Sequence, residues 1–274
     1  MKHRGILLLL VLVAVTPAAI ADPTGWANLG PPRAVAGDGH LAPRFSPDGR
    51  ELLVTGARFA GLAVVAVDGR GAPIDVAADE GAGVDGRFLA DGSVAFSARR
   101  AGERRTMIAD RSGNGRRFGG VRTAGAGEVS APIAFARGDR IYVRRRSTLE
   151  SVGTGDRFFG PVATSDGARV AFVGLATGIW IYELADGSLT HVGAGTAPSW
   201  SPDGRRLVFE RTEDDGHEIV ASDLWLHEVG RGLQRLTFTD DVLERRPAIG
   251  PDGASLAYDD DLGTIWIATL EVRP

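Results

Sequence analysis

Short runs of alternating apolar and polar residues recur along the chain, and a tight turn separates the two runs of each pair. The clearest example is 197–209, where Ser201-Pro202-Asp203-Gly204 lies between two such runs. Alternation with a period of two is typical of half-buried strands. An Asp-Gly turn favours a hairpin, because Asp binds the local backbone and Gly accepts a positive φ. The pattern therefore predicts β-hairpins.

The turn recurs six times, at a mean spacing of (253 − 49)/5, or about 41 residues. Its glycines are Gly49, Gly92, Gly138, Gly167, Gly204 and Gly253. Six residues before them stand Pro43, Gly86, Pro132, Pro161, Pro198 and Pro247. Blades of four-stranded propellers repeat every 40–45 residues or so. Proline lacks an N–H and is tolerated at the first residue of a strand, so we expect each proline to begin the innermost strand of a blade.

The later strands of each blade follow from the same register. In the third copy, Ile141 and Val143 mark the second strand and 148–152 the third. Third strands of the other copies are expected at 62–67, 105–109, 179–184, 224–229 and 265–270, and the clearest fourth strands at 188–191 and 235–238. A Trp recurs in three third strands, which predicts packing between blades.

The last copy has no fourth strand of its own. Arg33-Ala34-Val35 precedes the first copy, has no other partner, and is expected to complete the sixth blade. A ring closed in this way leaves no free sheet edge. The sequence thus predicts an all-β, six-bladed β-propeller.

The segments 198–209 and 236–258 resemble the propeller repeat of TolB-type (WD-repeat-like) proteins, and the resemblance extends over residues 33–270. It implies a six-bladed propeller. The TolB family also carries an α/β domain before the propeller, which binds other members of an envelope complex. We expect that domain to be absent, because about ten residues separate the predicted cleavage site from the first repeat strand. Prolyl-peptidase-like enzymes and oligogalacturonate lyases use similar propellers, so the fold does not choose a function.

The first 21 residues have the features of a secretory signal peptide. A basic start is followed by ten apolar residues, Ile6 to Val15, and by the small-residue cleavage signal Ala19-Ile20-Ala21. Ten residues are too few to span a bilayer, which takes about 20. We therefore expect cleavage and a single propeller domain over 22–274, exported to the periplasm or the extracellular space without a membrane span.

Composition excludes several kinds of chemistry. The chain has no Cys, and its only lysine is Lys2, so thiol chemistry and lysine Schiff bases are excluded from the mature chain. The mature net charge is 29 − 35 = −6, which is not the basic footprint of a nucleic-acid binder.

Charge is unevenly distributed along the chain. Residues 99–146 hold 13 Arg against four acids, and residues 203–261 hold 15 acids against seven Arg. In a ring of six blades these regions face each other. Ordinary solubility explains this asymmetry most simply. The alternatives are steering toward a polyanion or a charged partner, and a head-to-tail self-contact through the opposite flanks.

No local motif assigns catalytic residues. The chain contains no Gly-x-Ser-x-Gly, no Gly-x-x-x-x-Gly-Lys and no His-Glu-x-x-His. The aspartates of the recurring turns are interpreted as turn formers. Glu213-Asp214-Asp215-Gly216 and Asp259-Asp260-Asp261 offer oxygen ligands that could hold Ca²⁺, although their spacing is not that of an EF-hand and solvated acidic loops are commoner.

Ligands of propellers usually approach the mouth of the axial channel, where the innermost strands begin. We expect the residues just before the aligned Pro or Gly to line this mouth, with a solvated rim as the alternative. They include His40, Asp85, Glu128, Arg157 and Arg245. The leading hypothesis is a secreted or periplasmic, non-catalytic binding module for a protein segment or an anionic envelope polymer. The alternatives are a lyase-like enzyme acting on polysaccharide through His and Arg at the mouth, and a structural scaffold.

Overall fold

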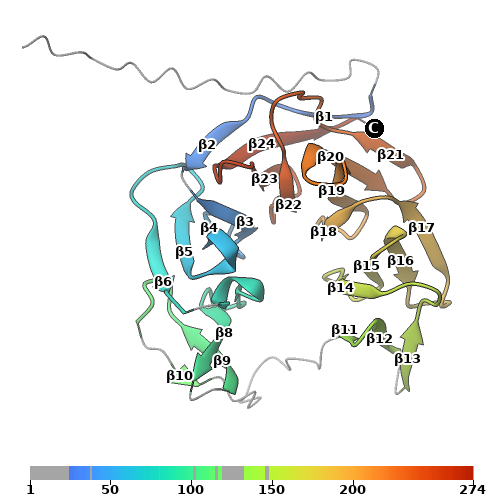
Figure 1. The fold of residues 1–274 in the computed structure, drawn as a ribbon, viewed down its shortest axis with the longest axis horizontal. Helices are drawn as coiled ribbons and strands as arrows, with labels where there is room; N and C mark the ends of the chain where they lie inside the picture. Colours follow the sequence, from blue (N-terminus) through green and yellow to red (C-terminus); the bar gives the residue numbers. More distant parts are fainter. Residues whose placement is uncertain are drawn as a thin grey trace, which may run out of the picture.

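Six antiparallel sheets are arranged around a central axis in the computed structural model (Figure 1), which confirms the predicted six-bladed β-propeller. The described residues contain no α-helix, only two short 3₁₀ helices, η1 (Ala57–Phe59) and η2 (Ala82–Val84). The structure describes residues 25–37, 39–79, 81–100, 103–114, 117–118, 133–145 and 148–273.

Each sheet is one blade, with its strands ordered outward from the axis. Blade one consists of β3 (His40–Phe45), β4 (Glu51–Gly56), β5 (Leu62–Ala66) and β6 (Ile74–Ala77). Blade two consists of β7 (Arg87–Phe88), β8 (Val94–Arg100), β9 (Glu103–Ala109) and β10 (Arg117–Phe118). Blade three consists of β11 (Ala134–Arg137), β12 (Arg140–Arg145) and β13 (Thr148–Val152).

The remaining blades follow in chain order. Blade four consists of β14 (Phe158–Ala163), β15 (Arg169–Gly174), β16 (Gly178–Glu183) and β17 (Leu189–Gly193). Blade five consists of β18 (Thr196–Trp200), β19 (Arg206–Asp214), β20 (Ile219–Glu228) and β21 (Gly232–Arg235). Blade six consists of β22 (Arg245–Ile249), β23 (Ser255–Asp259) and β24 (Ile265–Val272), with β1 (Ala27–Leu29) and β2 (Arg33–Ala36).

The ring is closed by the N-terminal part of the described chain, as predicted. Strand β2 pairs with the first half of β24, where Arg33 lies opposite Ile267. Strand β1, which the sequence pattern did not reveal, pairs with the second half of β24, where Leu29 lies opposite Leu270. Two segments from opposite ends of the described chain therefore complete one blade, and the outer edge of β24 is covered along most of its length.

Apolar side chains pack between neighbouring blades. Separate clusters of buried residues join blades six and one, one and two, three and four, four and five, and five and six. The cluster between blades five and six includes Leu224, Tyr258 and Trp266, which confirms inter-blade packing for this Trp. Within the described part of the chain, no such cluster joins blades two and three.

The four aligned prolines that the structure describes, Pro43, Pro161, Pro198 and Pro247, do not begin the innermost strands, contrary to expectation; they lie at β-bulges within them. Pro132 lies outside the described residues. Strands β3, β14, β18 and β22 each shift register at one bulge. The residue before each proline has a positive φ: Ala42 (52°), Gly160 (59°), Ala197 (53°) and Arg246 (47°). A bulge leaves one residue out of the hydrogen-bonding ladder, so a residue without an N–H is tolerated there.

Blade three is shifted relative to the predicted register. Asp139, after β11, accepts a backbone hydrogen bond from Phe158 at the start of β14, while Ile133 lies beside Gly167 at the opposite end of blade four. Strand β11 therefore runs opposite to the innermost strand β14, as second strands do. The three described strands of blade three thus correspond to the second, third and fourth strands of the other blades. The Gly138 hairpin joins the second and third of these positions, and 148–152 occupies the fourth. The prediction for this copy was wrong, because a hairpin turn with Gly can join the first and second strands of a blade or the second and third.

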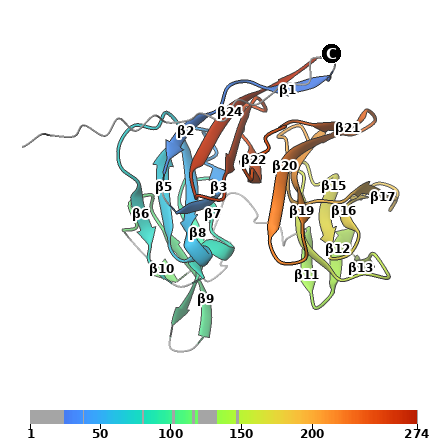
Figure 2. The same ribbon diagram turned by 45° about the horizontal axis from the view of Figure 1, so that its top comes forward.

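The two faces of the ring differ in their connections. The recurring Asp-Gly turns lie on one face, which we call the turn face. The second and third strands of each blade join on the other face, which we call the hairpin face. The hairpins β8–β9 and β19–β20 have long paired strands, of 7 and 7 and of 9 and 10 residues, and project from the hairpin face (Figure 2).

Candidate functional site

A cavity of about 680 Å³ lies along the axis between the innermost strands of blades one, two, four, five and six. Three arginines line it: Arg44, Arg87 and Arg246. The remaining wall is largely Phe and Pro: Phe45, Phe59, Phe88, Phe159, Pro43, Pro47, Pro198, Pro247 and Pro251. No Asp, Glu or His is among the described residues that line the cavity. Its walls are therefore apolar and its charged groups are cationic.

The bulges decide which side chains reach this cavity. Residues on both sides of the aligned Pro or Gly line it: Ala42, Arg44, Arg87, Gly160, Val162, Ala197, Ser199, Arg246 and Ala248. In a regular strand, neighbours two apart share one face. Here the proline between the two neighbours also lines the cavity in blades one, five and six, so three consecutive residues face the axis, because the left-handed residue before the proline breaks the alternation. The sequence alignment identified this column of residues, and the residues named for the channel mouth precede the aligned Pro or Gly by one to four positions.

Arg44 and Arg87 form a cationic pair in one wall of the cavity. Arg44 donates a hydrogen bond from Nη1 to the carbonyl oxygen of Gly86. Burial lowers the pKa of Arg44 and the charge of Arg87 adds to that effect, whereas the carboxylate of Asp85 opposes it. The Arg87 side chain is exposed and makes no hydrogen bond or ion pair with a described residue. Arg87 is thus the cation best placed to bind an anion.

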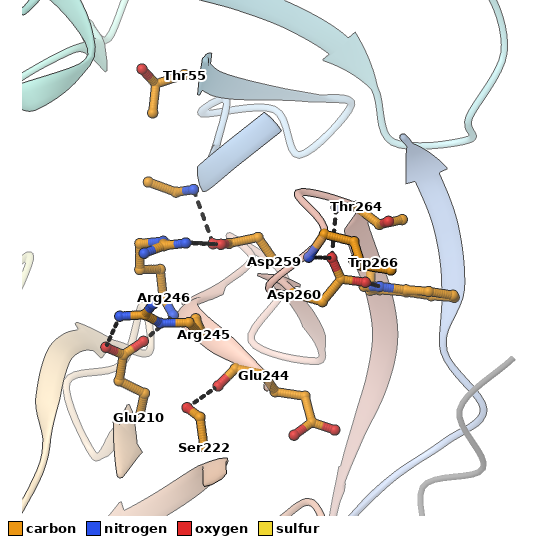
Figure 3. A network of polar contacts seen from close by, with 12 residues as sticks. Thr55, Glu210, Ser222, Glu244, Arg245, Arg246, Asp259, Asp260, Thr264 and Trp266 are labelled. Carbon is orange, nitrogen blue, oxygen red and sulfur yellow. Dashed lines mark hydrogen bonds and ion pairs between the residues drawn. The ribbon is translucent and has the colours of Figure 1, made fainter. Parts of the chain in front are cut away.

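Arg246 is held by a fully buried carboxylate (Figure 3). Its Nε lies 3.0 Å from both carboxylate oxygens of Asp259, and its Nη2 donates to Oδ2 of the same residue. The backbone N–H of Ala42 donates to Asp259 Oδ1 at 3.0 Å, which links blade six to blade one. Burial raises the pKa of Asp259 to about 6, although Arg246 opposes the shift. Arg246 is therefore fixed at the cavity wall.

Glu210 makes the corresponding link between blades five and six. Its Oε2 accepts the backbone N–H of Arg246 at 2.6 Å, and its Oε1 accepts the hydroxyl of Thr196 at 2.9 Å. Arg245 Nη2 lies 3.8 Å from Glu210 Oε1. Glu210 and Asp259 occupy the same repeat position, six residues after the turn glycine. These two acids stabilise the strained bulges and hold three blades in register.

Glu244 is a third buried acid in this region. Its Oε1 accepts the Thr239 hydroxyl at 2.7 Å, while its Oε2 has no partner among the described residues. Burial is the main cause that raises its pKa to about 7, and the nearby Asp223 adds to the shift. Glu244 does not line the axial cavity, so we expect it to affect the stability of the fold rather than ligand binding.

The four predicted site residues that the structure describes are not among the residues that line the cavity. His40 Nδ1 is 2.7 Å from the carbonyl oxygen of Gly37, and Asp85 accepts hydrogen bonds from Ser97. Arg157 forms an exposed ion pair with Asp139 at 3.1 Å.

Arg245 points to Glu210, next to the lining residue Arg246. Glu128 lies outside the described residues. Ligand binding by these five residues stays a prediction.

Four acids of the two stretches considered for Ca²⁺ use their oxygens in other contacts. Asp214 and Asp215 accept backbone N–H groups within their own hairpin tip. Asp259 binds Arg246, whereas Asp260 accepts the indole N–H of Trp266 at 2.8 Å. Across the described part of the chain, no three His, Cys, Asp or Glu residues gather as a metal site would require.

Comparison with known proteins gives the fold only. No protein-family profile and no curated protein matches the chain. A gluconolactonase from Xanthomonas campestris is similar in structure, with 12% identity, 93% of this chain and 95% of that chain covered, and a TM-score of 0.57.

A putative TolB from Agrobacterium tumefaciens has 17% identity over 86% of this chain and 91% of that chain, with a TM-score of 0.35. TolB from Acinetobacter baumannii has 15% identity and a TM-score of 0.36, and the match covers 86% of this chain and 56% of that chain. TolB proteins are thus among the structural neighbours, alongside propellers of other kinds. Membership of the TolB-type repeat family stays a prediction.

Proposed function

We propose that this chain is a non-catalytic binding module whose axial cavity takes a carboxylate-bearing segment of a partner protein or of an envelope polymer. The observation that carries the proposal is the composition of the cavity wall, which combines three Arg with Phe and Pro and includes no carboxylate. An unpaired guanidinium in a partly apolar wall binds carboxylates through charge-assisted hydrogen bonds. The aromatic and proline surfaces suit the apolar parts of such a segment.

The cavity wall favours binding over catalysis. A polysaccharide lyase needs a group that accepts or donates a proton near the substrate. The lining contains no His, Tyr, Lys, Asp or Glu among the described residues. His40, the imidazole that the sequence placed at the mouth, lies against the Gly37 carbonyl group instead.

We further propose that the module is exported, to the periplasm or the extracellular space, after removal of residues 1–21. Those residues lie outside the described part of the structure. In the described part, no helix has the length and apolar character needed to cross a bilayer.

Binding is tested with two fluorescent probes, an acidic peptide of alternating Asp and Phe and a galacturonate oligomer. We expect at least one to bind, and Arg87→Gln to weaken that binding about tenfold or more, because a hydrogen bond to a charged group contributes roughly 1.5–3 kcal/mol. The matched control is Arg50→Gln, which removes an exposed Arg with no side-chain partner among the described residues. Equal affinities of the two variants, or no binding of either probe, would contradict the proposal.

The same galacturonate samples test the alternative that the protein is a lyase. Unsaturated product would appear as ultraviolet absorbance during incubation. We expect none, and its appearance in the wild type would favour a lyase.

A further inference from the structure

Two long hairpins of opposite charge stand on the hairpin face of the ring. The basic hairpin is β8–β9 of blade two, with the exposed residues Arg99, Arg104 and Arg105. The acidic hairpin is β19–β20 of blade five, with four exposed acids near its tip: Glu213, Asp214, Asp215 and Glu218. Neither charge cluster lines the axial cavity.

The charges of both hairpins are incompletely neutralised within the chain. Arg99 lies directly opposite Arg104 in the strand pairing, and like charges in such positions repel. Arg104 donates a hydrogen bond to Asp85 at 3.4 Å, and Arg105 forms an ion pair with Glu103 of the same hairpin at 2.8 Å. Arg99 has no ion pair with a described residue. The four acids of the acidic hairpin likewise make no ion pair with any residue that the structure describes. Each hairpin would be stabilised by an external partner of the opposite charge.

Each ring carries both halves of a complementary contact. Blades two and five are three positions apart in a ring of six, so their hairpins lie across the channel from each other (Figure 1). A two-fold axis perpendicular to the channel can turn one ring onto the hairpin face of another. The basic hairpin of each copy then lies over the acidic hairpin of the other, and both contacts form together, as a two-fold interface requires.

Exposed apolar side chains on the same face supply further contact. Leu175 is 62% exposed in the β15–β16 connection, Val220 is 52% exposed near the tip of the acidic hairpin, and Leu262 is 77% exposed in the β23–β24 connection. Surface ion pairs contribute only about 0–1 kcal/mol each. The hairpin charges would therefore orient the two copies, and burial of the apolar rim would supply much of the affinity.

We propose that two copies of this chain associate face to face through their hairpin faces, in a closed two-fold dimer oriented by the basic and acidic hairpins. Because both hairpins project from one face, the contact is not the head-to-tail arrangement that charged flanks alone would allow. The dimer covers the hairpin-face ends of both channels. The proposal does not depend on what the axial cavity binds.

The first test is sedimentation velocity of the chain 22–274 at increasing concentration. We expect a dimer in about 50 mM salt, and a dissociation constant at least about tenfold weaker in about 500 mM salt, because salt screens exposed charges. A monomer in about 50 mM salt at about 100 μM would overturn the proposal. Growth beyond the dimer would also overturn it, since that indicates a head-to-tail contact.

Charge reversal identifies the contacting surfaces. The acid-swap variant carries Glu213→Arg, Asp214→Arg and Glu218→Arg, and it keeps Asp215, which accepts two backbone N–H groups of the turn. The base-swap variant carries Arg99→Glu, Arg104→Glu and Arg105→Glu. Each variant alone is expected to be monomeric, because it juxtaposes like charges. An equimolar mixture of the two is expected to form a heterodimer, and persistence of either homodimer would contradict the proposed contact.

A control variant separates hairpin contacts from net charge. It reverses three exposed acids away from the hairpin face: Asp68→Arg, Asp75→Arg and Glu271→Arg. It has the same net charge as the acid-swap variant and is expected to dimerise as the wild type does. Melting temperatures of all variants show that they are folded, and loss of the control dimer would mean that net charge, not the hairpins, governs association.

Discussion

At the residue scale, the most unusual groups are acids buried between blades. Glu244 is 1% exposed and Asp259 is fully buried, and burial raises the pKa of both, to about 7 and about 6. Asp259 is compensated by Arg246 and by a backbone N–H. One oxygen of Glu244 has no such partner. An ionised group left unpaired in the interior destabilises the folded state.

Glu244→Gln should increase stability at pH 8 and reduce its pH dependence. A folded pKa above the ordinary value of 4.5 means that the folded state binds more protons, so stability falls as pH rises from about 4.5 to about 7. Gln does not ionise and avoids this loss. We expect a gain on the order of 2 kcal/mol at pH 8 and little difference at pH 4, measured by urea unfolding across this range.

The exposed Glu213→Gln is the matched control for that series. Its side chain is outside the interior, so its unfolding should follow the wild type at every pH. If Glu244→Gln retains the full pH slope of the wild type, the buried carboxyl group is not its source.

At the element scale, the repeated bulge is the feature that shapes the site. Ala42, Ala197 and Arg246 adopt positive φ values that favour glycine, and a proline follows each of them. Such backbone costs on the order of 1–3 kcal/mol and persists only when surrounding contacts impose it. Here the buried acids of neighbouring blades supply two of those contacts, to the N–H groups of Ala42 and Arg246.

Replacing Ala197 by Gly should therefore leave stability unchanged or raise it by up to about 1 kcal/mol, because Gly adopts a φ of 53° without steric strain. Ala95→Gly, at a position of β8 where the pairing with both neighbouring strands is regular, should lose at least about 0.5–1 kcal/mol. Chemical denaturation of both variants makes the comparison. Equal losses at the two positions would mean that the bulge stores no strain.

At the scale of the whole molecule, closure depends on strands from opposite ends of the described chain. Strands β1 and β2 cover β24, and Val35 and Ala36 pack against the apolar cluster between blades six and one. Without them, the backbone groups along that edge would face solvent and offer a template for association.

A chain that begins at residue 37 should consequently unfold several degrees lower and aggregate on heating, in comparison with a chain that begins at Asp22. The truncation removes both closing strands but leaves the other strands of the ring intact. Thermal unfolding followed by circular dichroism and light scattering tests this. Identical melting curves would show that the clusters between blades hold the ring without closure.

The sequence by itself determined the architecture, because a ring of repeats is encoded locally. A turn at a regular spacing, with alternating strands around it, predicts the same blade wherever it occurs, and an unpaired segment at 33–35 predicts the closure. The same local information misplaced blade three, since the Gly138 hairpin suits two different connections. It named Arg245 for the channel mouth because this residue lies just before the aligned proline, whereas the bulge places its neighbour Arg246 in the cavity wall.

Only the tertiary structure decided which charges meet. Arg44 and Arg87 come from different blades and converge in one wall of the cavity. Asp259 pairs with Arg246, whereas its neighbour Asp260 accepts the indole N–H of Trp266. The basic and acidic stretches were visible in the sequence. Only the structure shows that both project from the hairpin face, because each includes the hairpin between the second and third strands of its blade. Such contacts join residues far apart in the chain, and their geometry is set by the packing of whole blades rather than by local pattern.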